Sequence, residues 1–318
     1  MDSSIKDDID QFKKRDNVTI LAHYYNSEEI QSVADFVGDS LALAKVAVDS
    51  PADTVVVCGV RFMAETVKLL NPEKTVLLPC AAADCPMAHM VDADKVAMLR
   101  SRYGDDLAVA CYVNSTLEAK ALSDVCITSA NALDVIGQMP QPIIHLIPDR
   151  NLGAHIAGAI PQKQFIFGDG CCAVHDDIDA CTVMALKDAY PGAPVLVHPE
   201  CSAAVRALAD VVGSTSALVG EVERGRAGTY IMCTVEGVRH RVAEFVGPEK
   251  KVVFPAPTPR CVDMDKVTLE MLRDVLMHHL DGRQERGKGF CVEIDEELAR
   301  RAARPVERMF SLSFAKRA

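Results

Sequence analysis

Apolar runs of strand length alternate with stretches of helical spacing along most of the chain. The runs VTILA from Val18, TVVVC from Thr54 and TVLLP from Thr75 set the pattern. Strands that alternate with helices are typical of α/β folds with parallel sheets. We expect strands at 18–22, 54–58, 75–79, 107–111, 142–148, 164–168, 194–197, 229–235, 251–254 and 290–294, and helices at 1–16, 41–48, 62–70, 130–139, 151–159, 217–225, 238–246, 269–280 and 296–313.

One segment of this pattern occurs three times with its spacing intact. Each copy opens with an apolar strand whose end carries two polar groups that flank a single residue. The three pairs are His23 and Tyr25, Tyr112 and Asn114, and His198 and Glu200. An Asp follows twelve positions after the first member of each pair, and a hydroxyl stands five positions further on, where a helix N-cap is expected. These residues are Asp35, Asp124 and Asp210, and Ser40, Ser129 and Thr215.

The same period selects three of the twelve cysteines. Cys85, Cys172 and Cys261 lie 87 and 89 residues apart, and each follows the last predicted strand of its repeat. Ligands bind at the carboxyl edge of open parallel sheets, so we expect three thiolates and three polar pairs around one cavity. Three thiolates suit an iron–sulfur cluster or zinc, and the absence of a CxxC pair disfavours an ordinary structural zinc site. For the other cysteines we expect core packing.

The repeat also predicts the domain organisation. We expect one domain at 1–104, a second at 105–190 and a third at 191–266. Residues 267–318 contain a helix, a polar turn, a short strand and a final helix, and we expect them to pack back on the first domain.

Composition narrows the classes of function. A net charge of −11 without a basic run argues against nucleic-acid binding, which depends on clustered Lys and Arg. No apolar run is long enough to span a membrane, and the first residues lack a secretory or transit pattern, so we expect a cytoplasmic protein. No glycine-rich phosphate loop occurs, so nucleotide binding is not expected. Twelve cysteines in 318 residues fall short of a disulfide scaffold, which leaves metal binding or catalysis.

Three histidines are candidates for acid–base chemistry. His23 and His198 occupy the same position in two repeats, which favours a function over a structural role at a sheet edge. Glu200 beside His198 adds a carboxylate. His175 follows Cys172 by three residues and has two interpretations: it orients a metal ligand or moves protons, or it is a surface histidine in a turn.

Five blocks of the sequence resemble the quinolinate synthase family, which are iron–sulfur transferases of de novo NAD biosynthesis. The blocks are LAHYYNSEEIQSVADFVGDSL, GVRFMAETVKLLNPEKTVLLP, YVNSTLEAKALSDVCITSAN, VHPECSAAVRALADVVGSTS and MDKVTLEML. The resemblance implies three similar three-layer αβα domains around a pseudo-threefold axis. It implies condensation of iminoaspartate with dihydroxyacetone phosphate to quinolinate, with release of phosphate and water. It also implies a [4Fe-4S] cluster with an open iron that acts as a Lewis acid, and functional coupling to an aspartate-oxidising enzyme.

The resemblance assigns residues one by one. The cluster ligands match Cys85 in ADCPMA, Cys172 in GCCAVH and Cys261 in RCVDM. The active-site set matches His23, Tyr25, Ser40, Tyr112, Asn114, Ser129, His198, Glu200 and Thr215, all of which except Tyr25 are expected to bind substrate. Of these, we expect His23, Tyr25, His198 and Glu200 to transfer protons. The chain departs from the family pattern in PCAAADC and FGDG, and Cys171 directly precedes Cys172, which keeps the spacing to His175.

The three hydroxyls at predicted helix starts suggest how an acidic protein binds anionic substrates. Unpaired N–H groups and the helix dipole favour an anion at a helix N-terminus. Iminoaspartate and dihydroxyacetone phosphate together carry two carboxylates and a phosphate. We expect Ser40, Ser129 and Thr215 to receive these groups, with Tyr112 and Asn114 as further donors.

Two other classes of function compete with this interpretation. An iron–sulfur electron carrier or sensor would not need imidazole, phenol and carboxylate groups around its cluster. A hydrolase with a cysteine nucleophile would pair Cys172 with His175, or Cys201 with His198.

Overall fold

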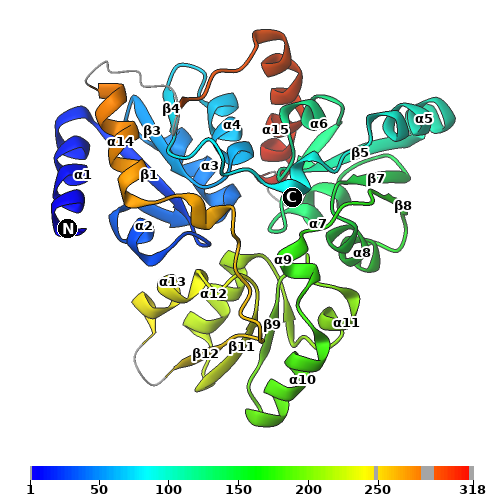
Figure 1. Ribbon diagram of the computed structural model, residues 1–318. Helices are drawn as coiled ribbons and strands as arrows, with labels where there is room; N and C mark the ends of the chain where they lie inside the picture. The colour runs from blue at the N-terminus through cyan, green and yellow to red at the C-terminus, as the bar shows by residue number, and fades with distance from the viewer. Residues whose placement is uncertain (1, 247–249, 281–289, 315–318) are drawn as a thin grey trace. The chain divides into compact units, whose positions relative to one another are not determined.

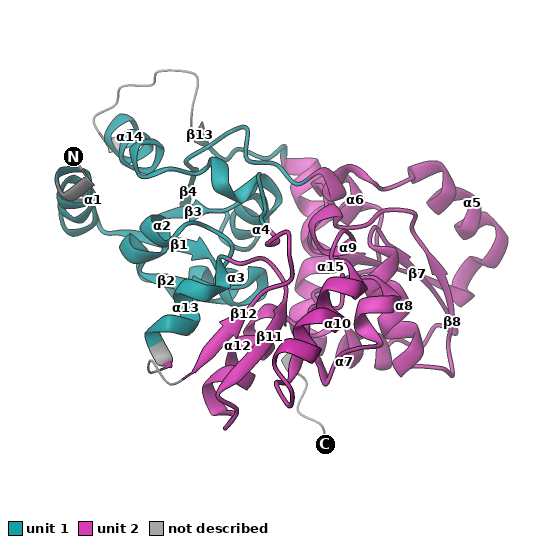
Figure 2. Ribbon diagram, turned by 60° about the horizontal axis from the view of Figure 1, so that its bottom comes forward, with its two compact units in different colours: residues 1–85, 237–244, 260–295 teal, residues 86–236, 245–259, 296–318 magenta. Residues whose placement is uncertain are grey.

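The computed structural model describes residues 2–246, 250–280 and 290–314. These residues form two compact units (Figure 2). Unit 1 comprises residues 1–85, 237–244 and 260–295, and unit 2 comprises residues 86–236, 245–259 and 296–318.

Unit 1 is built on one sheet with the strand order β13-β4-β3-β1-β2. Its strands are β1 Val18–His23, β2 Phe36–Gly38, β3 Thr54–Cys58, β4 Thr75–Leu78 and β13 Phe290–Cys291. All are parallel except β13, which pairs antiparallel with β4. The helices are α1 Asp2–Asp16, α2 Glu28–Val33, α3 Ser40–Asp49, α4 Arg61–Leu70, α13 Val238–Phe245, α14 Leu269–Leu280 and the short η3 Met264–Lys266. α3 packs with α4, α1 packs with α14, and the two pairs cover opposite faces of the sheet (Figure 1).

Unit 2 contains two sheets of four parallel strands, in the orders β6-β5-β7-β8 and β10-β9-β11-β12. The first has β5 Leu107–Tyr112, β6 Val125–Ile127, β7 Ile143–Ile147 and β8 Gln164–Phe167, and the second has β9 Val195–Val197, β10 Val211–Val212, β11 Thr229–Cys233 and β12 Lys251–Val253. The helices are α5 Ala93–Tyr103, α6 Leu117–Ala121, α7 Ala132–Gly137, α8 Arg150–Ala159, α9 Ala173–Asp176, α10 Ala180–Ala189, α11 Ala203–Arg206, α12 Thr215–Arg224, α15 Glu296–Phe314 and the short η1 Pro86–His89 and η2 Gly104–Asp106.

The three sheets share one topology. In each, the first strand of the repeat lies between the second and the third, and the fourth strand lies beyond the third. The strands consist of residues such as Val55, Val56 and Ile144 that are fully buried, because helices cover the sheets. The prediction of three similar αβα domains with parallel sheets is therefore confirmed.

The repeated Asp has the same structural role in all three sheets. Asp35, Asp124 and Asp210 each accept the backbone N–H of a first-strand residue fifteen positions earlier, with distances of 2.7, 2.7 and 2.8 Å. The Asp N–H in turn donates to the carbonyl of that same residue. This reciprocal pair of bonds ties the start of each second strand to the first strand.

The repeat also shows a feature at the amino edge that the sequence analysis did not identify. Lys74, Lys163 and Lys250 each precede the fourth strand of a sheet. Each Nζ donates to two backbone carbonyls at or just beyond the end of the helix that follows the second strand, at 2.6–3.0 Å. A cation at this position satisfies carbonyls that the helix itself leaves unpaired.

The expected N-caps are wrong by one residue or more. Asp39 caps α3 and Ser214 caps α12, so that Ser40 and Thr215 are the first helical residues. Ser129 lies in the turn before α7, whose N-cap position is Asn131. The hydroxyls that do act as N-caps belong to the short helices α2, α6 and α11, and they are Ser27, Thr116 and Ser202.

The pattern did not predict several elements. The strands β2, β6 and β10 have only two or three residues, which is too short for a period of two to be visible. The helices α2, α6 and α11 have four to six residues. The longer helices α5 and α10 were also missed.

The C-terminal segment differs in part from its prediction. We expected residues 267–318 to pack on the first domain, and α14 packs on α1 while β13 pairs with β4, as expected. α15, however, packs against α6, α7 and β6 in unit 2. Its Arg308 donates to the carbonyl of Asp124, and Ser313 accepts from Asn131. The polar turn at 281–289 lies outside the described residues, and the domain boundaries at 104, 190 and 266 stay predictions.

Candidate active site

The predicted polar pairs lie at the carboxyl ends of the first strands. His23 is the last residue of β1, and Tyr25 follows in the next turn. The Tyr25 N–H donates to His23 Nδ1 at 3.2 Å, and the two rings meet edge to face with centroids 4.5 Å apart. In unit 2 the Glu200 N–H contacts His198 Nδ1 at 3.4 Å in the same way. Because Nδ1 accepts, the neutral form of each imidazole carries its proton on Nε2, where it can donate to a substrate.

Glu200 lies in a buried polar group of unit 2. Its Oε2 is 2.9 Å from Nδ1 of His175 and 3.8 Å from Nδ1 of His198. His175 is 1% exposed and Glu200 3%. The two imidazole rings stack with centroids 4.5 Å apart. His175 is therefore not the surface histidine of the second interpretation.

The surroundings of Glu200 keep it ionised. Burial raises the pKa of this carboxyl, but the His198 imidazole and the hydrogen bond and charge of His175 lower it to about 2. The Tyr112 hydroxyl adds a hydrogen bond that lowers it further. At neutral pH Glu200 is thus an acceptor, to which His175 and the Tyr112 hydroxyl donate.

His175 connects this carboxylate to two other groups. A carboxylate can only accept, so the Nδ1 of His175 carries the proton that faces Glu200. Nε2 on the other side of the ring is 2.9 Å from Oγ1 of Thr234, which is fully buried. Thr234 directly follows β11 and was not identified from the sequence, because a single hydroxyl after a strand carries no distinguishing pattern.

Cys172 completes the group. Its Sγ is 3.2 Å from Nδ1 of His175, and the ligand atoms of Cys172, His175 and Glu200 all lie within 4.8 Å of one another, close enough to hold a metal ion. Cys171 contacts a different partner, since its Sγ lies 3.6 Å from Oδ2 of Asp176. The two adjacent thiols therefore have different surroundings.

Two residues at the N-terminus of α8 form hydrogen bonds with the backbone of Cys172 and of Glu200. Asp149 accepts the Leu152 N–H at 2.7 Å and the Cys172 N–H at 3.1 Å. Asn151 donates to the Glu200 carbonyl at 3.1 Å. Burial and then the charge of Glu200 raise the pKa of Asp149 to about 7. The sequence analysis did not identify Asp149 and Asn151 as site residues. Asp149 is the N-cap of α8, which begins at Arg150, one residue before the expected start at 151.

The second polar pair, Tyr112 and Asn114, contains a buried hydrogen-bond acceptor that has no partner. Tyr112 ends β5 and is 4% exposed, and its hydroxyl bonds Glu200. The Oδ1 of Asn114 is buried and has no hydrogen-bond partner. A buried acceptor without a partner is costly in a folded protein and is usually explained by a ligand or an ordered water.

The other two predicted ligands lie in loops of unit 1. Cys85 and Cys261 are half-buried, and burial raises the pKa of the Cys261 thiol. All twelve cysteines lie in the described part of the chain, and none forms a disulfide. Six of the remaining nine are buried as expected, whereas Cys171 and Cys291 are half-buried and Cys181 is exposed on α10.

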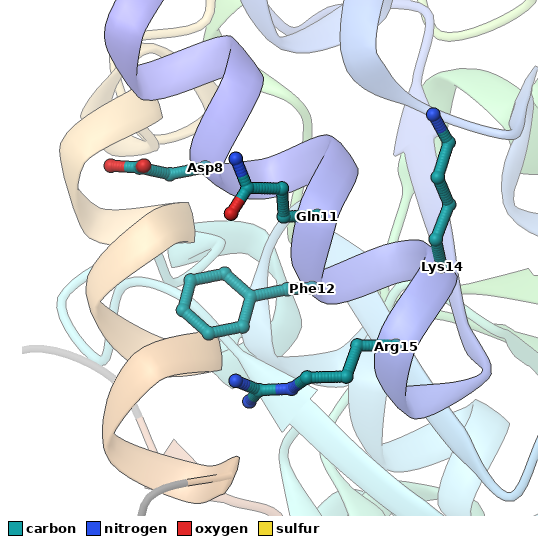
Figure 3. Close-up of a pocket in the computed structure, with 5 residues that line it drawn as sticks. All are labelled: Asp8, Gln11, Phe12, Lys14 and Arg15. Carbon is teal, nitrogen blue, oxygen red and sulfur yellow. The ribbon is translucent and has the colours of Figure 1, made fainter.

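The described surface pockets do not contain the predicted site residues. One pocket of about 490 Å³ is lined by Asp8, Gln11, Phe12, Lys14 and Arg15, which all come from α1 (Figure 3). Another, of about 240 Å³, lies in unit 2 and includes His89, Lys95, His145 and Asp169. Lys95 there forms an ion pair with Asp169 at 2.9 Å. Neither pocket includes a strand-end pair or one of the repeated cysteines.

One of the two hydrolase alternatives is excluded by burial. Cys201 is fully buried and its Sγ donates to the Cys233 carbonyl, while burial raises its pKa far above neutrality. Such a thiol is not a nucleophile. The contact between Cys172 and His175 remains. A half-buried thiol with two buried imidazoles and a buried carboxylate, near the carboxyl ends of parallel strands, defines an α/β enzyme whose site can hold a metal.

The chain is similar to quinolinate synthases over most of its length. A family model described as "Quinolinate synthetase A protein" matches residues 7–311. The quinolinate synthase of Fusobacterium nucleatum subsp. nucleatum is 42% identical over 309 residues, which cover 97% of this chain and 99% of that protein. That of Clostridioides difficile is 44% identical over 276 residues, with 87% and 90% covered. That of Methanoregula boonei is 41% identical over 308 residues, with 97% and 98% covered. The chain therefore belongs to the quinolinate synthase family, enzymes of NAD biosynthesis.

Proposed function

We propose that this enzyme condenses iminoaspartate with dihydroxyacetone phosphate to quinolinate and releases phosphate and water. The observation that carries the proposal is the group formed by the half-buried Cys172 with the buried His175 and Glu200, together with membership of the family. An electron carrier would have no use for a carboxylate kept ionised between two imidazoles.

We further propose that a [4Fe-4S] cluster is held by Cys85, Cys172 and Cys261. The donor set fits such a cluster, because the three cysteines are half-buried in loops and form no disulfide, whereas most of the others lie in the core. The contact of Cys172 with His175, and of Cys171 with Asp176, supports Cys172 as the ligand of the pair. When bound, the cluster would supply a Lewis-acidic iron that polarises a substrate oxygen.

The chain's own residues supply proton transfer. Each step beside a carbonyl or imine moves a proton at carbon or oxygen, which suits imidazole, phenol and carboxylate groups. We assign this work to His23, Tyr25, His198 and Glu200. Glu200 accepts and orients, because its pKa of about 2 leaves it ionised throughout the working range. His23 and His198 donate from Nε2, since Nδ1 of each accepts a backbone N–H.

We propose that the anionic groups of the substrates bind near Ser40, Ser129 and Thr215. Ser40 and Thr215 are the first residues of helices of ten residues, where backbone N–H groups lack helical partners. Ser129 lies in the turn before α7 and provides its hydroxyl, while Tyr112 and Asn114 are further donors. A lost charge-assisted hydrogen bond costs roughly 1.5–3 kcal/mol, so Ser40→Ala or Thr215→Val should weaken quinolinate binding about ten- to a hundredfold.

The test is quinolinate formation from the two substrates by anaerobically purified protein, with Glu200→Gln and His23→Ala as variants. Both variants should retain iron and sulfide but lose most turnover. Near-normal turnover in both would remove these residues from the proposed role. Full activity after iron chelation would favour the cysteine hydrolase that the contact of Cys172 with His175 permits.

A cytoplasmic location and coupling to an aspartate-oxidising enzyme stay predictions. Within the described part of the chain, the structure contains no helix with the length and apolarity that a membrane span requires.

A further inference from the structure

A polar side chain stands eight positions after the first member of each strand-end pair. It is Gln31 in the first repeat, Lys120 in the second and Arg206 in the third. The three residue types differ in size and charge, but the side chain of each carries N–H donors. They lie in the short helices α2, α6 and α11, which follow the turns that carry the pairs.

Gln31 is 5% exposed and holds the first turn by its amide group. Nε2 lies 3.0 Å from the Tyr24 carbonyl and 2.8 Å from the Asn26 carbonyl. These two carbonyls belong to the residues on either side of Tyr25. A third contact, of 2.9 Å, reaches the carbonyl of Gly237. A side chain at Gly237 would meet the Tyr24 carbonyl at 2.7 Å, so only glycine allows this close approach.

Lys120 holds the second turn and is fully buried. Its Nζ lies 2.5 Å from the carbonyl of Ser115, the residue after Asn114. The ammonium group also interacts electrostatically with Cys111 in β5. A lysine is rarely buried completely, because removing its charge from water is costly unless that charge is paired. A buried lysine that bonds a turn carbonyl therefore points to a specific requirement at that turn.

Arg206 holds the third turn from a half-buried position. Its Nη1 contacts the Pro199 carbonyl at 3.3 Å and makes a close contact with the Cys201 carbonyl. Pro199 and Cys201 are the residues on either side of Glu200. The geometry matches that of Gln31, although the sequence between the strand and the helix is different.

We propose that Gln31, Lys120 and Arg206 are positioning residues of the active site, each of which fixes the backbone turn that presents the second member of a polar pair. The residues so presented are Tyr25, Asn114 and Glu200. The inference rests on the proposed role of these three residues in binding and proton transfer. None of the three positioning side chains needs to touch the substrate.

The three side chains make similar contacts although they are of three different residue types. A side chain retained only for packing would be apolar at a buried position, since an unpaired polar group there destabilises the fold. Instead, Gln31 and Arg206 direct N–H donors at both carbonyls that flank the second pair member, and Lys120 directs its ammonium at one of them, that of Ser115. Displacement of a reacting group by about 1 Å can cost a hundredfold in rate, so rigid turns are expected where pairs act together.

The repeat supplies a matched control at the opposite edge of the sheets. Lys163 in unit 2 donates to the carbonyls of Met139 and Gln141, at 2.6 and 2.8 Å. It makes the same kind of contact as Lys120, a lysine ammonium on turn carbonyls, but at the amino edge. Lys163→Met should lower stability without changing kcat/KM.

The experiment compares Lys120→Met and Arg206→Met with the donor-retaining variants Lys120→Gln and Arg206→Lys. Hydrogen exchange is measured at the turns 112–116 and 198–202, and kcat/KM is measured for quinolinate formation by cluster-loaded protein. Both Met variants should exchange at least about tenfold faster at their own turn only, and kcat/KM should fall about ten- to a hundredfold with kcat affected most. The donor-retaining variants should recover most of both, because Gln and Lys can still donate to the carbonyls.

Unchanged exchange at the turn in the Met variants would overturn the inference, and so would faster exchange with normal kcat/KM. If Lys120→Met does not fold, Arg206→Met still decides the matter, because Arg206 is only half-buried. An inactive parent would refute the proposed function, whereas the exchange rates would still show whether these side chains fix the turns.

Discussion

At the residue scale, the surroundings of a side chain determine its protonation and therefore its chemistry. Glu200 is buried, yet two imidazoles and a phenol keep its pKa near 2. The same negative charge, with burial, raises the pKa of Asp149 to about 7. Glu200 is therefore ionised at neutral pH, whereas Asp149 changes its protonation near that pH.

The two adjacent cysteines give the sharpest prediction at this scale. Cys172 contacts His175, whereas Cys171 contacts Asp176. We expect Cys172→Ser to lose most iron and sulfide after anaerobic reconstitution, because a hydroxyl is a poor ligand for a soft iron–sulfur core. Cys171→Ser is the matched control and should keep both. The opposite result, with full iron in Cys172→Ser alone, would show that the ligand assignment is wrong.

A buried thiol in β5 gives a prediction about pH. Burial raises the pKa of Cys111, but hydrogen bonds from neighbouring side chains, that of Cys126 first, and the Lys120 charge lower it from 9.0 to about 7. A depressed pKa stabilises the fold above the unfolded value of 9.0 and loses this effect as the pH falls through about 7. The difference in Tm between the parent and Cys111→Ala should therefore widen from pH 7 to pH 9. A constant difference across this range would contradict the ionised thiol.

At the element scale, much of the fold could be predicted because strands and helices follow from apolar spacing. The strand at 54–58 was predicted to the residue, and the repeat identified the ends of the first strands. The N-caps at Ser40 and Thr215 were wrong because Asp39 and Ser214 stand directly before them and accept the first helical N–H groups instead. The short strands β2, β6 and β10 are held by pairing with a neighbour, which spacing along the chain does not reveal.

The site was only partly predictable for the same reason. His23, Tyr112, His198 and Glu200 became candidates because they occupy equivalent positions of the repeat. His175 stayed ambiguous, since its contacts with Glu200 and Thr234 join segments far apart in the sequence. The contacts of Asp149 with Cys172 and of Thr234 with His175 are likewise long-range. The donors Gln31, Lys120 and Arg206 share a position but not a residue type, so a search for repeated letters passes over them.

The recurring Asp predicts a measurable contribution to stability. Asp210 accepts the Val195 N–H at 2.8 Å. Asp210→Ala should lower the free energy of unfolding by about 1 kcal/mol, the usual value of one hydrogen bond. Asp210→Asn keeps a carbonyl oxygen that can accept this N–H and should lose clearly less. Denaturant unfolding of the three proteins tests this, and equal losses in both variants would mean that the hydrogen bond is not the source of the effect.

At the scale of the whole molecule, one sheet topology occurs three times. Each copy has its candidate site residues at the carboxyl edge of the sheet, and hydrogen bonds that stabilise the fold lie elsewhere in the sheet. Aspartates tie second strands to first strands, and lysines satisfy helix ends at the amino edge. The carboxyl edge carries the polar pairs, the cysteine loops and the donors that fix the turns. Unit 2 alone brings together Tyr112, Cys172, His175, His198 and Glu200.

The central claim is that this enzyme makes quinolinate and needs an iron–sulfur cluster to do so. The most direct measurement is quinolinate formed from iminoaspartate and dihydroxyacetone phosphate by anaerobically reconstituted protein, assayed before and after iron chelation. We predict steady formation of quinolinate by the reconstituted protein and its loss after the iron is removed, with recovery on reconstitution. Absence of quinolinate from protein that carries its full iron and sulfide, or undiminished turnover after chelation, would contradict the account.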